Sequence, residues 1–81
     1  MTARITLLYF ASLRDAAGRD REVVDTAAPD LRTLYAEARA RHGFALPVER
    51  LRVAVDGAFA LWDQPPPDGG EVAFVPPVSG G

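Results

Sequence analysis

The residues best suited to chemistry lie at the C-terminal end of the chain, in the segment Pro-Pro-Val-Ser-Gly-Gly at 76–81. The two prolines favour a stiff, extended start, and the last three residues carry almost no side-chain bulk. Such a tail can enter a narrow channel, and neither Gly80 nor Gly81 has a Cβ atom to shield the terminal carboxylate. ATP can convert a carboxylate to an acyl-adenylate, and a sulfur nucleophile can then displace AMP to leave a thiocarboxylate. The reactive group would be the carboxylate of Gly81, although terminal glycines also occur at frayed chain ends.

The rest of the chain offers few other reactive groups. There is no cysteine, which excludes disulfides, thiolate metal sites and a cysteine nucleophile. The single histidine, His42, excludes a multi-histidine metal site and is most simply a cation at the end of a helix. All nine basic residues are arginine, so no lysine side chain can attack an activated carboxylate or accept an isopeptide bond. We expect no metal, no bound cofactor and no catalysis by the isolated chain.

Size and charge restrict the classes of protein to consider. A chain of 81 residues with 48% hydrophobic residues is sufficient for one compact domain. The net charge of −2 predicts neither a nucleic-acid-binding nor a membrane-surface protein. The apolar stretch near the N-terminus is short and weakly flanked, so we interpret it as a strand rather than a signal peptide. We expect a cytoplasmic protein.

The elements that must position the tail are five strands and one substantial helix. β-branched and aromatic runs separated by turn residues predict strands at 4–10, 21–26, 51–57, 58–62 and 71–76. The segment 12–20 predicts a turn with some helical character, and Asp56-Gly57 is typical of a hairpin. A helix is predicted over 29–43, with Pro29 in its first turn, Asp30 at the positive end of its dipole and Gly43 as its stop. Its apolar stripe comprises Leu31, Leu34, Tyr35, Ala38 and then Phe44.

This order, β-β-α-β-β-β, predicts an α+β, ubiquitin-like β-grasp fold in which one helix covers one face of a mixed sheet. The first and last strands would lie side by side at the sheet centre. We assign residues 1–76 to the β-grasp domain and residues 77–81 to a flexible Gly-Gly tail.

One face of the sheet is predicted to carry apolar residues that no helix covers. Side chains alternate along a strand, so if Ile5, Leu7 and Tyr9 pack beneath the helix, Leu8 and Phe10 point through the open face. On the last strand, Val72 and Phe74 would then point inward, which leaves Ala73 and Val75 beside Phe10. A cluster of this kind marks an interface unless a loop folds back to cover it.

Three stretches resemble the small subunits of molybdopterin synthase, which are ubiquitin-like sulfur carriers. They are LLYFASLRDAAG at 7–18, AVDG at 54–57 and DGGEVAFVPPVSGG at 68–81. The resemblance implies that an adenylyltransferase related to ubiquitin-activating enzymes uses ATP to adenylate Gly81, which then becomes a thiocarboxylate. It also implies that the tail enters a large catalytic subunit, in a complex of two small and two large chains. There it would donate sulfur to cyclic pyranopterin monophosphate in molybdenum cofactor biosynthesis.

The resemblance also implies a set of partner contacts. Apolar contacts of the family fall on Phe10, Phe59 and Val75, and a family arginine falls on Arg14, which could pair with a partner carboxylate. The tail residues Pro77, Val78 and Ser79 would bind the partner beside Gly80 and Gly81. Two residues depart from the family: Val75 replaces a residue that is often aromatic, which predicts a smaller contact, and Asp56 replaces an asparagine with little expected effect on the turn.

Three alternatives remain open from the sequence. The chain could carry sulfur for another pathway, such as thiamine synthesis, tRNA thiolation, or a cysteine or siderophore route, with the same chemistry at Gly81. It could be a ubiquitin-like modifier conjugated to target lysines. It could also be a plain interaction module whose tail is inert.

Overall fold

The computed structural model describes residues 2–77 and contains a five-stranded mixed sheet with one main helix. The predicted tail residues Val78, Ser79, Gly80 and Gly81 lie outside the described residues. The elements, in chain order, are β1 (Ala3–Tyr9), α1 (Ser12–Ala17), β2 (Arg21–Thr26), α2 (Leu31–His42), the 3₁₀ helix η1 (Val48–Arg50), β3 (Arg52–Val55), β4 (Ala58–Ala60) and β5 (Glu71–Val75).

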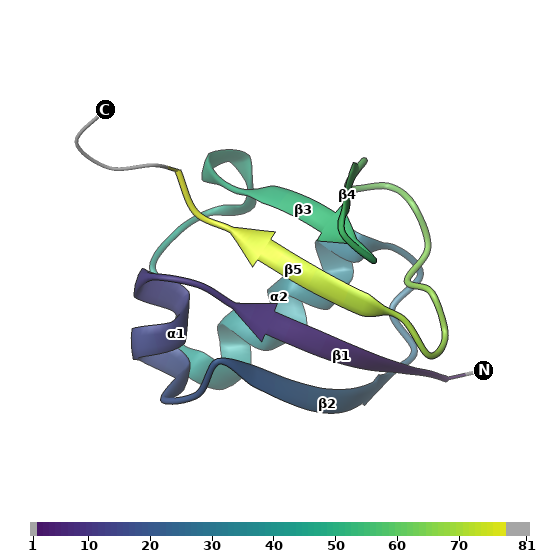
Figure 1. Ribbon diagram of the computed structural model, residues 1–81, viewed down its shortest axis with the longest axis horizontal. Helices are drawn as coiled ribbons and strands as arrows, with labels where there is room; N and C mark the ends of the chain where they lie inside the picture. The colour runs from purple at the N-terminus through teal and green to yellow at the C-terminus, as the bar shows by residue number, and fades with distance from the viewer. Residues whose placement is uncertain (1, 78–81) are drawn as a thin grey trace.

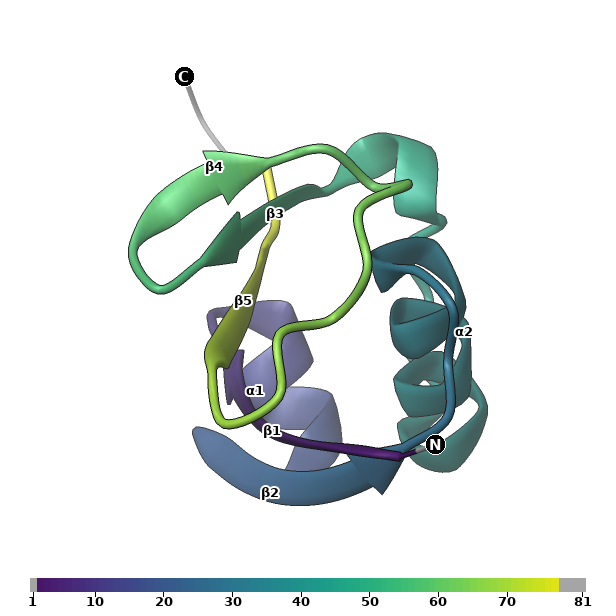
Figure 2. The same cartoon turned by 90° about the vertical axis from the view of Figure 1, so that its right-hand side faces the viewer.

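The sheet has the strand order β2-β1-β5-β3-β4 (Figure 1). β1 and β5 are parallel neighbours, whereas the other pairs are antiparallel. Because β1 and β5 are parallel, both strands end at the same end of the sheet, and the residues that follow them leave the sheet there (Figure 1). The side view shows α2 covering one face of the curved sheet (Figure 2). The predicted β-grasp fold, with its first and last strands side by side, is confirmed.

The predicted bounds of the main helix require correction at its start. α2 begins at Leu31 rather than 29, because Asp30 has an extended backbone and its carboxylate accepts the Thr33 N–H at 2.7 Å as an N-cap. The loop after β4 satisfies two further N–H groups, since the Gln64 and Trp62 carbonyls accept from Leu31 and Arg32. At the other end the helix stops after His42, where Gly43 is left-handed with φ 71°.

β2 has the predicted bounds, β1 is shifted by one residue toward the N-terminus, and the last three strands are shorter than predicted. Two small helices complete the connections. β1 ends at Tyr9, so Phe10 follows the strand rather than closing it, and the helical character expected after it is the six-residue α1. β3, β4 and β5 end at Val55, Ala60 and Val75, because turn and loop geometry begins directly after each. The short helix η1 was not predicted.

Between β3 and β4 the chain reverses at Asp56-Gly57, as predicted for this dipeptide. Both residues have positive φ, 50° and 87°, which is the backbone that a tight hairpin turn requires. The Asp56 carboxylate accepts the Glu71 N–H at 2.9 Å and so ties this turn to the start of β5. The replacement of asparagine by aspartate is therefore compatible with the turn, as expected.

The core lies between the sheet and α2 and follows the predicted alternation. Ile5, Leu7 and Tyr9 of β1 are buried, as are Val72 and Phe74 of β5. The predicted helix stripe is also buried and comprises Leu31, Leu34, Tyr35, Ala38 and Phe44. The Tyr35 ring contacts the Phe74 ring edge-on, with 5.0 Å between centroids. The buried residues of β1, β5 and α2 are therefore those that the sequence spacing predicted to be buried.

The turn before β5 is fixed by hydrogen bonds to the start of β1. The Asp68 carboxylate accepts the Arg4 N–H at 2.8 Å, and the Arg4 carbonyl accepts the Gly69 N–H at 2.8 Å. Gly69 has φ 80°, and a Cβ atom on Gly70 would lie 2.7 Å from Cγ of Pro67. This turn thus starts β5 in register with β1.

Within residues 2–77, no helix has the length and apolar character that crossing a membrane would need.

Candidate interaction surface

The sheet face that α2 leaves uncovered carries a row of apolar side chains. Cross-strand partners lie on the same face of a sheet, and one row across the sheet runs Leu8, Ala73, Ala54 and Phe59. Leu8 and Ala73 are half-buried, whereas Phe59 is 67% exposed. We call this the open face. No described loop covers Phe59, so the interface interpretation of this face is favoured over the alternative.

Phe10 and Val75 extend the open face toward the edge at which the chain leaves the sheet. The register pairs Tyr9 with Phe74, and Phe10 and Val75 are the residues that follow this last pair along the two chains. Phe10 is 46% exposed and Val75 is half-buried. Val75 alternates with the buried Phe74, as predicted, and Phe10 is exposed as expected, whereas the role of both residues in binding a partner stays a prediction.

A groove of about 480 Å³ opens beside Val75. Its lining comes from the end of β5 with the two prolines that follow, from Phe59 of β4, and from η1 with the start of β3. The Arg52 guanidinium lies over the Phe59 ring, 5.3 Å from its centroid, which is a cation–π geometry. Three of the predicted contact residues, Phe59, Val75 and Pro77, therefore line one groove although they come from different parts of the chain.

Arg14 is exposed on α1, at the edge of the sheet where β1 and β5 both end (Figure 1). It does not line the groove, and it has no ion-pair partner within residues 2–77. The structure thus brings Phe59 and Val75 together in the groove, whereas Arg14 and Phe10 lie outside its lining. Arg52 was missed from the sequence, although its alternation with the buried Val53 was a signal that it faces outward.

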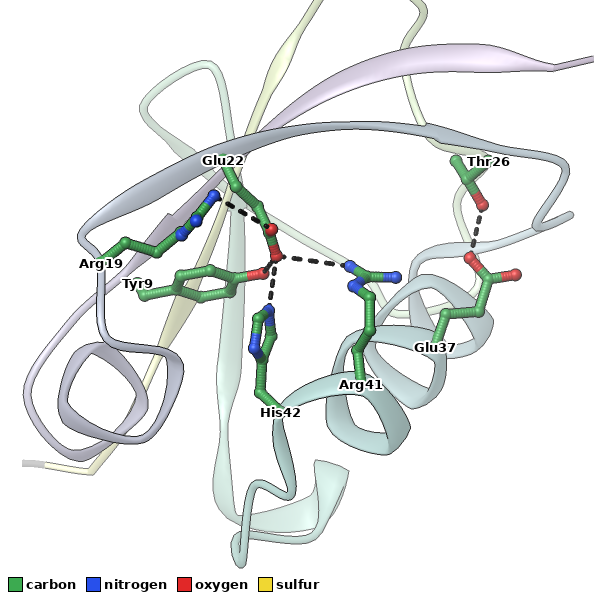
Figure 3. Close-up of polar contacts among 7 residues, drawn as sticks. All are labelled: Tyr9, Arg19, Glu22, Thr26, Glu37, Arg41 and His42. Atoms are coloured by element: carbon green, nitrogen blue, oxygen red, sulfur yellow. Dashed lines mark hydrogen bonds and ion pairs between the residues drawn. The ribbon is translucent and has the colours of Figure 1, made fainter.

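A cluster of polar side chains surrounds Glu22 of β2 on the face of the sheet that α2 covers (Figure 3). This cluster was not predicted from the sequence. The Tyr9 hydroxyl donates to Oε1 of Glu22, and Nε2 of His42 donates to the same oxygen at 2.6 Å. Arg41 lies 3.5 Å from Oε1, and Arg19 lies 3.7 Å from Oε2. The register explains its placement, because Glu22 pairs with the buried Leu7 and so must face α2, and the sequence alone does not specify this pairing.

The surroundings of Glu22 favour its charged form. Burial raises the pKa of its carboxyl, but hydrogen bonds from Tyr9 and His42 and the charges of His42 and Arg41 outweigh burial and hold that pKa below 4.5. Burial and the same hydrogen bond raise the pKa of the Tyr9 hydroxyl. A second hydrogen bond, 2.7 Å between Thr26 and Glu37, also joins β2 to α2 (Figure 3). These contacts attach α2 to the sheet and lie away from the open face.

Among the described residues, no group of three or more histidine, aspartate or glutamate side chains is arranged to hold a metal ion.

Comparison with known proteins shows the family to which the chain belongs. The model of the ThiS family matches residues 7–81. The chain belongs to the ThiS family. It is 38% identical over 80 residues to the molybdopterin synthase sulfur carrier subunit of Escherichia coli K12, which covers 95% of this chain and 99% of that protein. The resemblance stated from the sequence is thereby confirmed.

Solved structures of similar proteins share the fold. The Pyrococcus furiosus protein assigned as molybdopterin converting factor, subunit 1, has a TM-score of 0.77 and 28% identity, over 94% of this chain and 99% of that one. A chain in the complex of subunits 1 and 2 of molybdopterin-converting factor from Helicobacter pylori 26695 has a TM-score of 0.65 and 21% identity, over 100% of both chains. At that identity the second match shows the fold alone.

Proposed function

We propose that this chain is the sulfur carrier of a molybdopterin synthase and that the carboxylate of Gly81 carries the sulfur. One observation carries the proposal. The open face and the groove lie beside the end of β5, where Pro76 and Pro77 begin the tail. A partner that binds the open face and the groove would therefore also contact the start of the tail. The similarity to the Escherichia coli carrier subunit supports the same assignment.

The proposed chemistry proceeds in two steps on one carboxylate. First, an oxygen of the Gly81 carboxylate attacks the α-phosphorus of ATP in an adenylyltransferase, forming the acyl-adenylate and releasing pyrophosphate. A sulfur nucleophile then attacks the acyl carbon, AMP leaves, and the thiocarboxylate remains. The isolated chain catalyses neither step; it binds no cofactor itself, and ATP belongs to the activating enzyme.

We propose the large catalytic subunit as the second partner, in an assembly of two small and two large chains in the cytoplasm. In that assembly the thiocarboxylate sulfur attacks a carbon of cyclic pyranopterin monophosphate and displaces an oxygen substituent, which forms an acyl–sulfur–carbon link between Gly81 and the pterin. Water then hydrolyses the acyl–sulfur bond, which leaves the sulfur on the pterin and regenerates the Gly81 carboxylate. Phe10, Phe59 and Val75 would contact the large subunit, and Arg14 would pair with one of its carboxylates. Pro77, Val78, Ser79 and Gly80 would lead Gly81 into its active site.

Intact-mass spectrometry of the protein purified from its own host tests the proposal. We expect a sulfur-for-oxygen exchange at Gly81 that is reversed when cyclic pyranopterin monophosphate and the large subunit are added. Exchange without reversal would indicate that the chain carries sulfur for another pathway, and higher-mass conjugates would indicate a protein modifier. An unmodified carboxylate, even with ATP, sulfide and the activating enzyme present, would leave only an interaction module.

Extending the chain by one bulky residue after Gly81 gives a second test. Thiocarboxylation should be abolished, because the carbonyl of Gly81 would then lie in a peptide bond rather than in a free carboxylate. The matched control is the unextended chain incubated with the same enzymes. A normal yield of thiocarboxylate from the extended chain would contradict the proposal.

A further inference from the structure

The outer side of β2, away from β1, is a free edge of the sheet. β2 is the first strand in the order β2-β1-β5-β3-β4, and within residues 2–77 no other strand pairs with its outer side (Figure 1). Its six residues, Arg21–Thr26, pair with β1 in continuous register and include no proline. A free edge of this kind presents N–H and C=O groups with which a further strand can pair. The groove is lined from β5, β3 and β4, so the edge of β2 is a separate surface.

The hydrogen bonds of β1 show which backbone groups of β2 face outward. The Tyr9 N–H donates to the Asp20 carbonyl at 2.9 Å, whereas the Thr6 N–H donates away from β2, to the Gly70 carbonyl at 3.0 Å. Hydrogen-bonded pairs of an antiparallel ladder recur at every second residue. By this register, the residues of β2 whose backbone groups face β1 are Glu22, Val24 and Thr26. Those whose N–H and C=O groups face outward are Arg21, Val23 and Asp25.

The three outward residues also carry a self-complementary set of side chains. Val23 lies in the middle and is 61% exposed. Arg21 and Asp25 lie two residues to either side of it and are exposed on the same face, because side chains alternate along a strand. Within residues 2–77, Arg21 has no ion-pair partner, whereas Asp25 pairs with Arg4 at 3.0 Å. The exposed face of β2 therefore presents a cation, an apolar side chain and an anion, in that order.

A second copy of β2 fits this edge in the antiparallel direction. With a twofold axis at Val23, this residue faces its own copy, and Arg21 of each chain faces Asp25 of the other. All the residues that face one another have outward backbone groups, so each facing pair can exchange two N–H···O=C hydrogen bonds. Moving the axis by one residue in either direction would place Val23 opposite a charged residue. The register centred on Val23 thus satisfies the backbone and the charges together.

We propose that the edge of β2 is a homodimerisation surface, at which two copies of this chain pair β2 with β2 about a twofold axis at Val23. The two sheets then form one continuous sheet. This inference goes beyond the proposed function. β1 separates β2 from β5, so the dimer leaves the groove and the start of the tail of both copies accessible. The contact involves one short strand from each copy, so we expect a weak association.

Sedimentation velocity of the full-length chain, from about 10 μM to about 1 mM, tests the proposal because small interfaces associate in such a range. We expect a monomer–dimer equilibrium. Arg21→Asp and Asp25→Arg should each weaken the dimer about tenfold, because each places like charges opposite one another at two symmetry-related positions. The variant with both changes should dimerise within about threefold of the native chain, because opposite charges face one another again. The matched control is Arg32→Asp on exposed α2, which should leave the dimer unchanged.

A backbone variant tests the pairing independently of charge. Val23→Pro removes an outward N–H group and should abolish the dimer, while the fold is retained because proline is tolerated where the N–H faces solvent. Circular dichroism verifies that each variant is folded, and the charge variants decide the question if the proline variant is not. Amide hydrogen exchange of the native chain gives a further readout. Exchange at the outward N–H groups of β2 should slow as the protein concentration rises, because these groups become paired in the dimer.

Three outcomes would overturn the inference. The first is a native chain that stays monomeric at about 1 mM. The second is a double charge variant that dimerises no better than either single variant, because the register centred on Val23 would then be wrong. The third is an association that Phe59→Arg abolishes and the β2 variants leave intact, which would assign self-association to the open face. The proposed function is tested separately, by thiocarboxylate formation at Gly81.

Discussion

At the scale of single residues, Glu22 shows how one carboxylate can join three elements. It lies on β2, accepts from Tyr9 of β1 and pairs with His42 and Arg41 at the end of α2. A half-buried carboxylate costs free energy unless hydrogen bonds and positive charges compensate it. Here they do so, since the pKa of Glu22 lies below its ordinary value despite burial. Glu22 therefore contributes to stability through its charged form.

Glu22→Gln should lower the free energy of unfolding by about 1–2 kcal/mol at neutral pH, because it removes charge-assisted hydrogen bonds. The pKa of Glu22 is lowered in the folded protein, so its stabilisation is complete above the unfolded value and disappears as pH falls through the folded value. The difference between variant and native protein should thus vanish in strong acid. Urea unfolding at neutral and strongly acidic pH measures it.

The matched control is Asp25→Asn, which removes the same kind of charge from the exposed ion pair with Arg4. It should change stability little, because water screens an exposed pair. An equal loss of unfolding free energy in both variants would show that the contacts of Glu22 stabilise the protein no more than an exposed ion pair does.

At the scale of elements, the turn before β5 sets the position of the strand that leads to the tail. Gly70→Ala should lower stability by about 1–2 kcal/mol, because its new Cβ would lie 2.7 Å from Cγ of the rigid Pro67 ring. Thermal unfolding measures the loss. In a Pro67→Ala background that close contact is absent, so the same substitution should cost less. Equal costs in both backgrounds would contradict this account of the turn.

The open face is the second element-scale feature. Phe10→Arg should weaken binding to the large subunit by about 1–3 kcal/mol without unfolding the domain, since Phe10 is 46% exposed in the free chain. Titration calorimetry and circular dichroism check the two parts. Ala36→Arg, at an exposed position of α2, is the control and should bind normally. An unchanged affinity of the Phe10 variant would refute the assignment of the open face.

At the scale of the whole molecule, stability and carrier function should reside in different parts of the chain. Phe74 of β5 is fully buried and contacts the rings of Tyr35 and Trp62. Phe74→Ala should cost about 3–5 kcal/mol, a large share of the total for a domain of 81 residues. Deleting Gly80 and Gly81, which follow every described element, should leave the melting temperature unchanged and abolish thiocarboxylate formation. Calorimetry with mass spectrometry measures both, and a coupled loss would contradict the separation.

The candidate site was predictable only in part. The outward direction of Leu8 and Val75 followed from alternation along two strands, because period-two geometry is local. The groove was not predictable, since it joins Phe59, Val75 and Arg52 from β4, β5 and β3. Their proximity depends on the pairing of Arg52 with Val75 and of Ala54 with Phe59, which no local pattern specifies.

By itself, the sequence determined the order of the five strands and the main helix, the core residues of β1, β5 and α2, and the chemical character of the segment that ends in Gly81. It could do so because strand alternation, helix periodicity, the Gly43 stop and the Asp56-Gly57 turn each depend on a few neighbouring residues. Only the tertiary structure decided that Glu22 meets His42, that Arg52 lies over Phe59 and that both line a groove with Val75. These contacts join residues far apart in the chain, and they exist only once the strand register and the docking of α2 are set.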